Sequence, residues 1–261
     1  MVELIFKISQ QLSRTAGITR VLVRGPEALD QDALHGLLFQ TQMNFLVSHE
    51  YTHHVHRHCV EATASTQLRN ELPVGRGYGG LDPQAQELDA DGYAVMLVLA
   101  HLLRGERRTS ALEALGQGGL PTLAGDAVLL LCFLLTASAY FCSSWHTGAC
   151  IVSLYDLTHP PPPIRIKYVI EVAKMWCSLN GSLPTTWFDP ARLQSLFAAA
   201  AELIDATTKQ TWQQQISALR SREGDEYDRL LYARFEELRR NPDASDARIS
   251  PTSSPNPDIP A

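Results

Sequence analysis

Residues 49–53 read His49-Glu50-Tyr51-Thr52-His53, which is the pattern H-E-x-x-H. Residues four positions apart share one face of a helix, so the two imidazoles can bind one metal ion. The glutamate between them then lies beside the open coordination position of a zinc ion, where it can act as general base on a zinc-bound water. The pattern therefore indicates a hydrolytic metal site. Three fixed letters also arise by chance, and the alternative is a polar, histidine-rich face in contact with solvent.

The segment before this motif has the spacing of a partly buried helix. Apolar residues recur at helical intervals over positions 34–47, and this pattern is typical of a helix with one buried face. Asp30 or Asp32 is suited to be its N-cap. We therefore expect a helix from about Gln31 to Ala64 that presents the motif on its other face.

A strand is predicted just upstream of the motif helix. Residues 18–24 alternate and are β-branched, and Gly25-Pro26 ends them. Its first six residues, Ile18 to Val23, would offer an edge along which an extended peptide could bind. Residues 2–14 fit a short amphipathic helix or a strand.

A second helix is expected from Asp82-Pro83 to about Leu103. Aspartate is a good N-cap, and proline suits the first helical position. Glu87 and Asp91 are four positions apart, so they share a face of this helix.

Two histidines leave a catalytic zinc short of its usual three protein ligands. Glu87 follows His53 by 34 positions, which leaves room for a loop and an antiparallel helix. Ala90 and Ala94 are small and allow a close approach to the first helix. We expect Glu87 to be the third ligand and Asp91 to accept the outer ring N–H of a ligating histidine. The alternative is two acids on a solvated face.

Composition limits the class of protein. The chain has 261 residues, of which 45% are hydrophobic, and a formal net charge of −6. It can bury one sizeable core, and its mild acidity argues against a nucleic-acid partner. The five cysteines form no C-x-x-C pair, and no secretory signal is recognised at the start. We therefore expect reduced thiols and a cytoplasmic protein.

The most apolar segment covers residues 127–145, where no charged residue occurs. It is near the lower length limit of a transmembrane helix, and its serines and threonine favour a buried core helix. Membrane association through this segment is the alternative. Further helices are expected over 163–180, 190–219 and 226–240. Residues 241–261 are rich in proline and serine and are expected to be a disordered tail.

The run H-E-x-x-H followed by E-x-x-A-D resembles the gluzincin metallopeptidases, especially the family of the CAAX prenyl endopeptidase and the bacterial heat-shock membrane peptidase. Residues 158–166 strengthen the likeness, because they are similar to that family's T/S-H-P-P-x-x-x-R-I element, with His159 and Arg165 six positions apart. The resemblance covers about residues 43–170. It implies that His159 helps to stabilise an oxyanion and that Arg165 holds the substrate or an acidic ligand, which agrees with the charge that develops in amide hydrolysis. A turn histidine and a surface arginine are the alternatives.

The resemblance implies a mainly α-helical fold with a small β-sheet and a zincin-like core built on the two motif helices. Residues 1–240 would form one metallopeptidase domain with a C-terminal helical extension. The family's membrane members have several spans, whereas this chain has one weak candidate. A second likeness, to phage-exclusion proteases of the Lit type, rests on size and the motif region.

The expected function is a zinc endopeptidase that binds one Zn²⁺ per chain through His49, His53 and Glu87 and acts on a protein or peptide substrate. Glu50, His159 and Arg165 would take part in catalysis. A zinc-containing regulatory protein that cuts little is one alternative, and a phage-defence or toxin-type protease with one target is another. Three histidines that follow the motif are interpreted as exposed polar residues at the helix end, namely His54, His56 and His58.

Overall fold

The computed structural model describes residues 2–15, 30–56, 58, 80–144, 154–190, 193 and 219–240. Within these ranges the chain forms seven α-helices and two short 3-10 helices, and it contains no strand. The prediction of a mainly α-helical chain is confirmed. No small sheet is present in the described ranges, and the strand predicted over 18–24 lies outside them, as do the tail 241–261 and nearly all of the helix predicted over 190–219.

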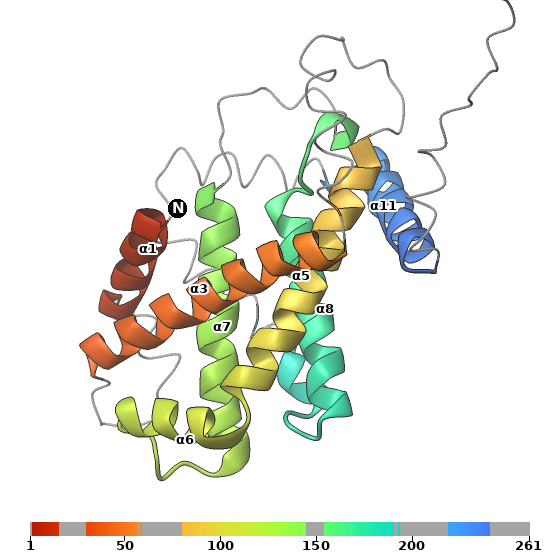
Figure 1. Ribbon diagram of the computed structural model, residues 1–261. Coiled ribbons are helices and arrows are strands. Elements are labelled where there is room, and N and C mark those ends of the chain that lie inside the picture. Colours follow the sequence, from red (N-terminus) through yellow and green to blue (C-terminus); the bar gives the residue numbers. More distant parts are fainter. Residues whose placement is uncertain are drawn as a thin grey trace, which may run out of the picture.

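The α-helices are distributed along the whole described chain (Figure 1). Their bounds are α1 (Val2–Arg14), α3 (Gln31–Val55), α5 (Leu81–Leu102), α6 (Gly105–Ala114), α7 (Thr122–Ser144), α8 (Pro162–Leu179) and α11 (Arg222–Arg240). The 3-10 helices are η2 (Leu154–Asp156) and η3 (Thr185–Phe188).

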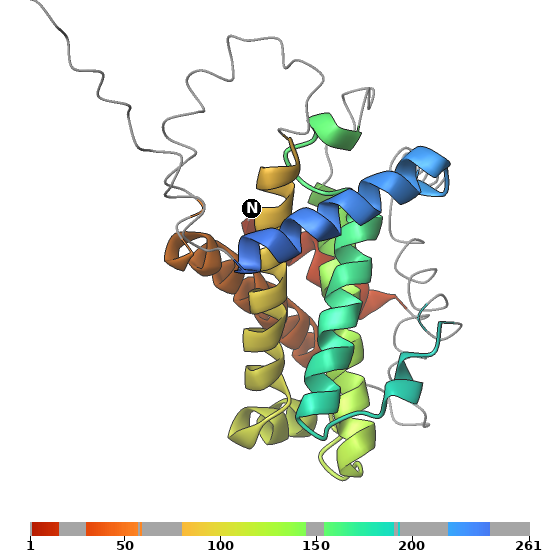
Figure 2. The same cartoon turned by 90° about the vertical axis from the view of Figure 1, so that its right-hand side faces the viewer.

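Helices α5 and α8 lie side by side, with α11 across one face of the pair and α3 on the other (Figure 2). Helix α3 also crosses α7, and α1 packs against α3 and α7 (Figure 1). The buried apolar side chains form one cluster that extends from Ile5 in α1 to Phe235 in α11. The motif helix α3 and the helix α5 thus meet at the edge of a continuous core.

Helix α3 begins as predicted, because the Asp30 side chain accepts hydrogen bonds from the backbone N–H groups of Asp32 and Ala33. Such a cap satisfies two of the donors that the first turn leaves unpaired. The helix ends at Val55, nine residues before the predicted end at Ala64. Position 57 and positions 59–64 lie outside the described residues.

Helix α5 begins two residues earlier than predicted, at Leu81, and its N-cap is Gly80. Asp82 is therefore not the N-cap, which corrects the prediction. Its carboxylate instead pairs with Arg234 of α11, at 2.5 Å from Nε and 3.1 Å from Nη2. Asp82 thus lies inside the first turn of α5, where its carboxylate connects this helix to α11.

Residues 127–144 of the predicted apolar segment lie in α7, and the side chains described there are largely buried, whereas residue 145 lies outside the described residues. Among the described helices, α7 alone is long and apolar enough to cross a membrane, over Thr122–Cys142, and 78% of the tested window is buried inside the protein. That burial is what a core helix shows, and the same length and composition would suit a membrane span.

Helices α5 and α8 approach closely at Gly92. A Cβ built on Gly92 would lie 2.7 Å from the Tyr168 hydroxyl of α8. Helix α8 itself begins at Pro162, after Pro161 in an extended conformation, because proline fixes φ near the helical value and needs no N–H partner at a helix start. The glycine and the proline start together determine how α8 lies against α5.

Candidate metal centre

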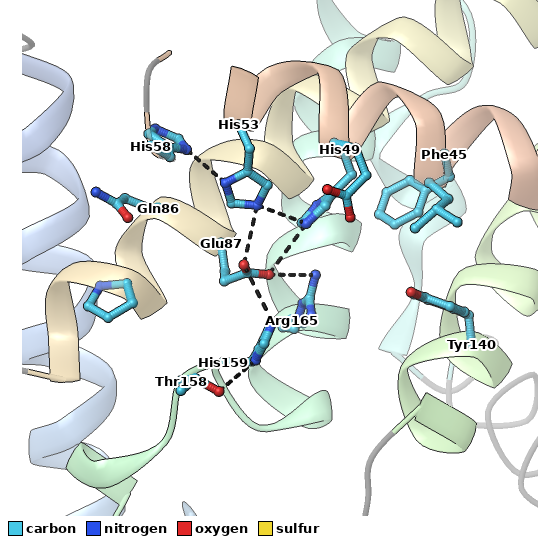
Figure 3. A pocket seen from close by; sticks show the side chains of 13 residues that line it. Phe45, His49, His53, His58, Gln86, Glu87, Tyr140, Thr158, His159 and Arg165 are labelled. Carbon is cyan, nitrogen blue, oxygen red and sulfur yellow. Dashed lines mark hydrogen bonds and ion pairs between the residues drawn. The ribbon is translucent and has the colours of Figure 1, made fainter. Parts of the chain in front are cut away.

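His49 and His53 lie on the same face of α3, one turn apart. Their Nε2 atoms are 3.0 Å from each other, and their ring centroids are 4.6 Å apart. His49 is buried, at 7% relative exposure. Figure 3 shows both rings directed at Glu87, which comes from α5. The helical spacing of the motif therefore brings the two nitrogens to one point, as the sequence predicts.

Glu87 completes a group of three candidate ligands. Its Oε1 lies 3.2 Å from His53 Nε2, and its Oε2 lies 3.4 Å from His49 Nε2. The three donor atoms all lie within 4.8 Å of one another. Ala90 and Ala94 are completely buried, as expected of small residues between closely packed helices.

The surroundings of Glu87 suit a cation. Oε2 of Glu87 is buried and forms no hydrogen bond, although His49 Nε2 and Arg165 Nη2 each lie 3.4 Å from it. A buried carboxylate oxygen without a hydrogen bond is costly. A metal ion among the three donors would satisfy this oxygen. Two imidazole nitrogens and one carboxylate are also the ligand set of catalytic zinc sites. The residues present therefore fit a zinc ion.

Asp91 lies one turn beyond Glu87 and behind His49. Its Oδ1 is 3.0 Å from His49 Nδ1. When His49 is protonated, this contact is an ion pair. Asp91 is completely buried. It occupies the place predicted for it, next to the ring nitrogen of His49 that faces away from Glu87 (Nδ1).

Arg165 of α8 binds Asp91 through two hydrogen bonds. Its Nε and Nη2 donate to the two carboxylate oxygens, each at 2.7 Å, and Nη2 also lies 3.4 Å from Glu87 Oε2. The guanidinium stacks on Phe141, 4.3 Å from the ring centroid, and Arg165 is 9% exposed. The structure thus brings Arg165 to the site, where its two-pronged contact is with Asp91.

These charges alter the protonation of the site. Burial alone would lower the pKa of His49, but the adjacent Asp91 and Glu87 raise it to about 9. Burial would raise the pKa of Asp91, but the charge and hydrogen bonds of Arg165 and the contact with His49 lower it. Burial likewise opposes ionisation of Glu87, but His49, His53 and Arg165 bring the pKa of Glu87 well below its ordinary value. Without a metal, two carboxylates therefore surround a protonated His49.

The three candidate ligands His49, His53 and Glu87 line a pocket of about 430 Å³. Glu50 follows His49 on α3, is exposed, and lies at this pocket. His159 lines the pocket from the turn before α8, with Nε2 3.5 Å from Glu87 Oε1 and Nδ1 2.9 Å from the Thr158 hydroxyl oxygen (Figure 3). All the residues predicted for the site except Asp91 therefore line one cavity, and Asp91 is buried behind His49.

Three residues near the site were not predicted to belong to it. His58 Nδ1 lies 3.1 Å from His53 Nδ1, and Asp89 Oδ2 lies 2.5 Å from His56 Nδ1. His58 is therefore mostly buried rather than exposed as predicted, with 13% of its side chain exposed, whereas His56 lies at the helix end as predicted and is 28% exposed. His54 is exposed, as predicted. Asp89 could have indicated these contacts. It lies two residues from Glu87 and therefore close to the C-terminal end of α3, which carries the histidines.

Tyr140 of α7 is a further pocket residue that the sequence did not indicate. It is 8% exposed, and Figure 3 shows its hydroxyl directed toward the pocket. Burial raises the pKa of this hydroxyl against the opposing charge of Arg165, so Tyr140 remains neutral. Within the apolar segment 127–145 it resembled any other core residue.

Comparisons with protein families, with curated proteins and with solved structures found no match for this chain.

Proposed function

We propose that this chain is a zinc-dependent endopeptidase. His49, His53 and Glu87 would hold the zinc. The observation that carries the proposal is the convergence of both Nε2 atoms on the Glu87 carboxylate, with Glu50 exposed to the same pocket. A site that only binds metal has no need of a free carboxylate at this position.

When bound, zinc acts as a Lewis acid that polarises the scissile carbonyl and makes the attacking water more acidic. Glu50 accepts a proton from that water and passes it to the leaving amine, as a general base and then a general acid. His159 and Tyr140 are at the pocket and can donate hydrogen bonds to the oxygen that gains negative charge. Arg165 fixes Asp91, and Asp91 fixes His49.

The test compares the tag-free, zinc-loaded chain with Glu50→Gln and with a matched control, Glu106→Gln. Glu106 is exposed on α6 and does not line the pocket. New N-termini are counted by mass spectrometry after incubation with casein and with a bacterial lysate, and zinc is measured by elemental analysis. We expect Glu50→Gln to keep its zinc and to lose about 10²–10⁴-fold in cleavage, and the control to match the wild type.

Full cleavage by Glu50→Gln would exclude the mechanism. Zinc-loaded wild type that cuts neither casein nor any lysate protein would favour the non-catalytic zinc protein. Cleavage of one lysate protein with casein intact would favour a protease with a single target. His159→Gln should keep zinc and slow cleavage by about 10²-fold, the loss typical of one oxyanion donor.

A further inference from the structure

Next to the proposed zinc centre lies a second group of metal-binding side chains, which we call the outer triad: His56, His58 and Asp89. Asp89 Oδ2 is 2.5 Å from His56 Nδ1 and 3.6 Å from His58 Nε2. One donor atom from each residue lies within 4.8 Å of the others. The outer triad uses the C-terminal end of α3 and the same α5 helix that supplies Glu87.

The side chains of the outer triad are held in place by partial burial and by packing against neighbouring residues. Its side chains are partly buried, at 28% exposure for His56 and 13% each for His58 and Asp89. The His56 ring packs edge-on against Tyr93, with centroids 4.5 Å apart. A hydrogen bond between Asp89 and His56 alone would need no third group. Here His58 presents a second imidazole nitrogen to the same carboxylate oxygen.

Two imidazoles and one carboxylate suit borderline divalent cations such as zinc, nickel or copper, with water in the remaining positions. We propose that the outer triad is a second divalent-cation site. We further infer that its occupancy weakens metal binding at the inner centre through the contact between His53 and His58; this coupling, unlike the outer site, rests on the function proposed above.

The coupling follows from the hydrogens on two rings. The Nδ1 atoms of His53 and His58 are 3.1 Å apart, so only one of them can carry a hydrogen. A neutral imidazole has one N–H. If His53 carries it on Nδ1, its Nε2 lone pair is free for the inner metal, and the hydrogen of His58 is on Nε2, facing Asp89. If His58 carries it on Nδ1, the Nε2 lone pair of His58 is free for the outer metal. The hydrogen of His53 is then on Nε2, so the inner site lacks this ligand.

Both sites can fill together only if the contact between His53 and His58 is broken. Each metal therefore binds less tightly when the other is present, and the loss is reciprocal by linkage. Zinc at low concentration fills one site, and excess zinc fills the second at the expense of the hydrogen bond that orients His53.

The experiment measures zinc per chain by equilibrium dialysis against buffered free zinc, followed by elemental analysis, on tag-free wild type, His49→Gln, His56→Gln and the double variant. Both substitutions keep the His53 and His58 rings, whose Nδ1 atoms face each other, although His49 and His56 each contact one of these rings. We expect one zinc in each single variant, none in the double variant, and two in the wild type. The second zinc of the wild type should bind about tenfold or more weakly than the single zinc of His49→Gln.

His49→Gln that binds no zinc, with His56→Gln still binding one, would exclude the outer site and leave the proposed zinc centre intact. His56→Gln that binds none would instead exclude the inner centre. Zinc retained by the double variant would show that the outer triad is not where it binds. Equal affinity for the second zinc of wild type and the single zinc of His49→Gln would refute the coupling. Circular dichroism of each variant confirms that the helical fold is kept.

Discussion

The stability of the metal-free chain should fall as the pH rises above neutrality, because of one buried histidine. Despite its burial, His49 has its pKa raised to about 9 by Asp91 and Glu87, against 6.5 for an ordinary histidine. Its protonation stabilises the fold fully below pH 6.5, and the contribution is lost as the pH rises through about 9. At 1.36 kcal/mol per pKa unit, the largest loss is about 3 kcal/mol.

The assay is urea unfolding of the chelator-treated chain at about pH 6 and about pH 9.5, which bracket the window in which folded and unfolded chains bind different numbers of protons. His49→Gln removes the titrating ring and should flatten the dependence. His101→Gln is the matched control, since His101 is exposed on the same α5 helix that carries Glu87. His101→Gln should show the same change in the free energy of unfolding between the two pH values as the wild type.

Zinc should remove this trend, because the zinc-bound His49 carries no proton to lose. A ligating histidine must be neutral, so zinc competes with the proton on His49 and binds more tightly as the pH rises. The stabilisation by a fixed zinc concentration should therefore grow between about pH 6.5 and 9. Metal-free stability that is flat over this range, or that falls equally in His49→Gln, would refute the assignment of the charge to His49.

Three further substitutions test how the helices hold the site. Asp91→Asn should weaken zinc binding about 10–100-fold in dialysis, and it should cost about 3–5 kcal/mol in urea unfolding because Arg165 loses its buried partner. Gly92→Ala should cost about 1–3 kcal/mol, since the new Cβ would meet a side-chain atom of α8 at 2.7 Å; unchanged stability would show that the two helices separate freely. Tyr227→Phe should cost about 1–3 kcal/mol, because the buried Gln84 side-chain oxygen loses its donor on α11, and a loss under about 0.5 kcal/mol would contradict that role.

The sequence could predict those parts of the site that depend on the spacing within one helix. The four-residue interval between His49 and His53, and between Glu87 and Asp91, determines which side chains share a face, whatever the rest of the fold does. The N-cap at Asp30 is equally local. These features needed no knowledge of how the helices cross.

Contacts between distant segments could not be predicted in this way. Arg165 lies 74 positions from Asp91, and its role depends on how α8 packs on α5. The contact of Asp82 with Arg234 likewise joins positions 152 residues apart, and no local pattern indicates it. Tyr140 faces the pocket only because α7 passes beneath α3, and an apolar run does not show which of its residues will line a cavity.

Helix α7 makes the timing of synthesis matter for this protein. Its partners α1 and α3 precede it in the chain, whereas α8, which also contacts it, follows. Until α8 has been synthesised, a helix with the length and composition of a membrane span therefore lacks the contacts that α8 makes with it. At about 5–20 residues per second the ribosome needs a few seconds to reach the end of α8. During that interval α7 has its contacts with α1 and α3 but not those with α8.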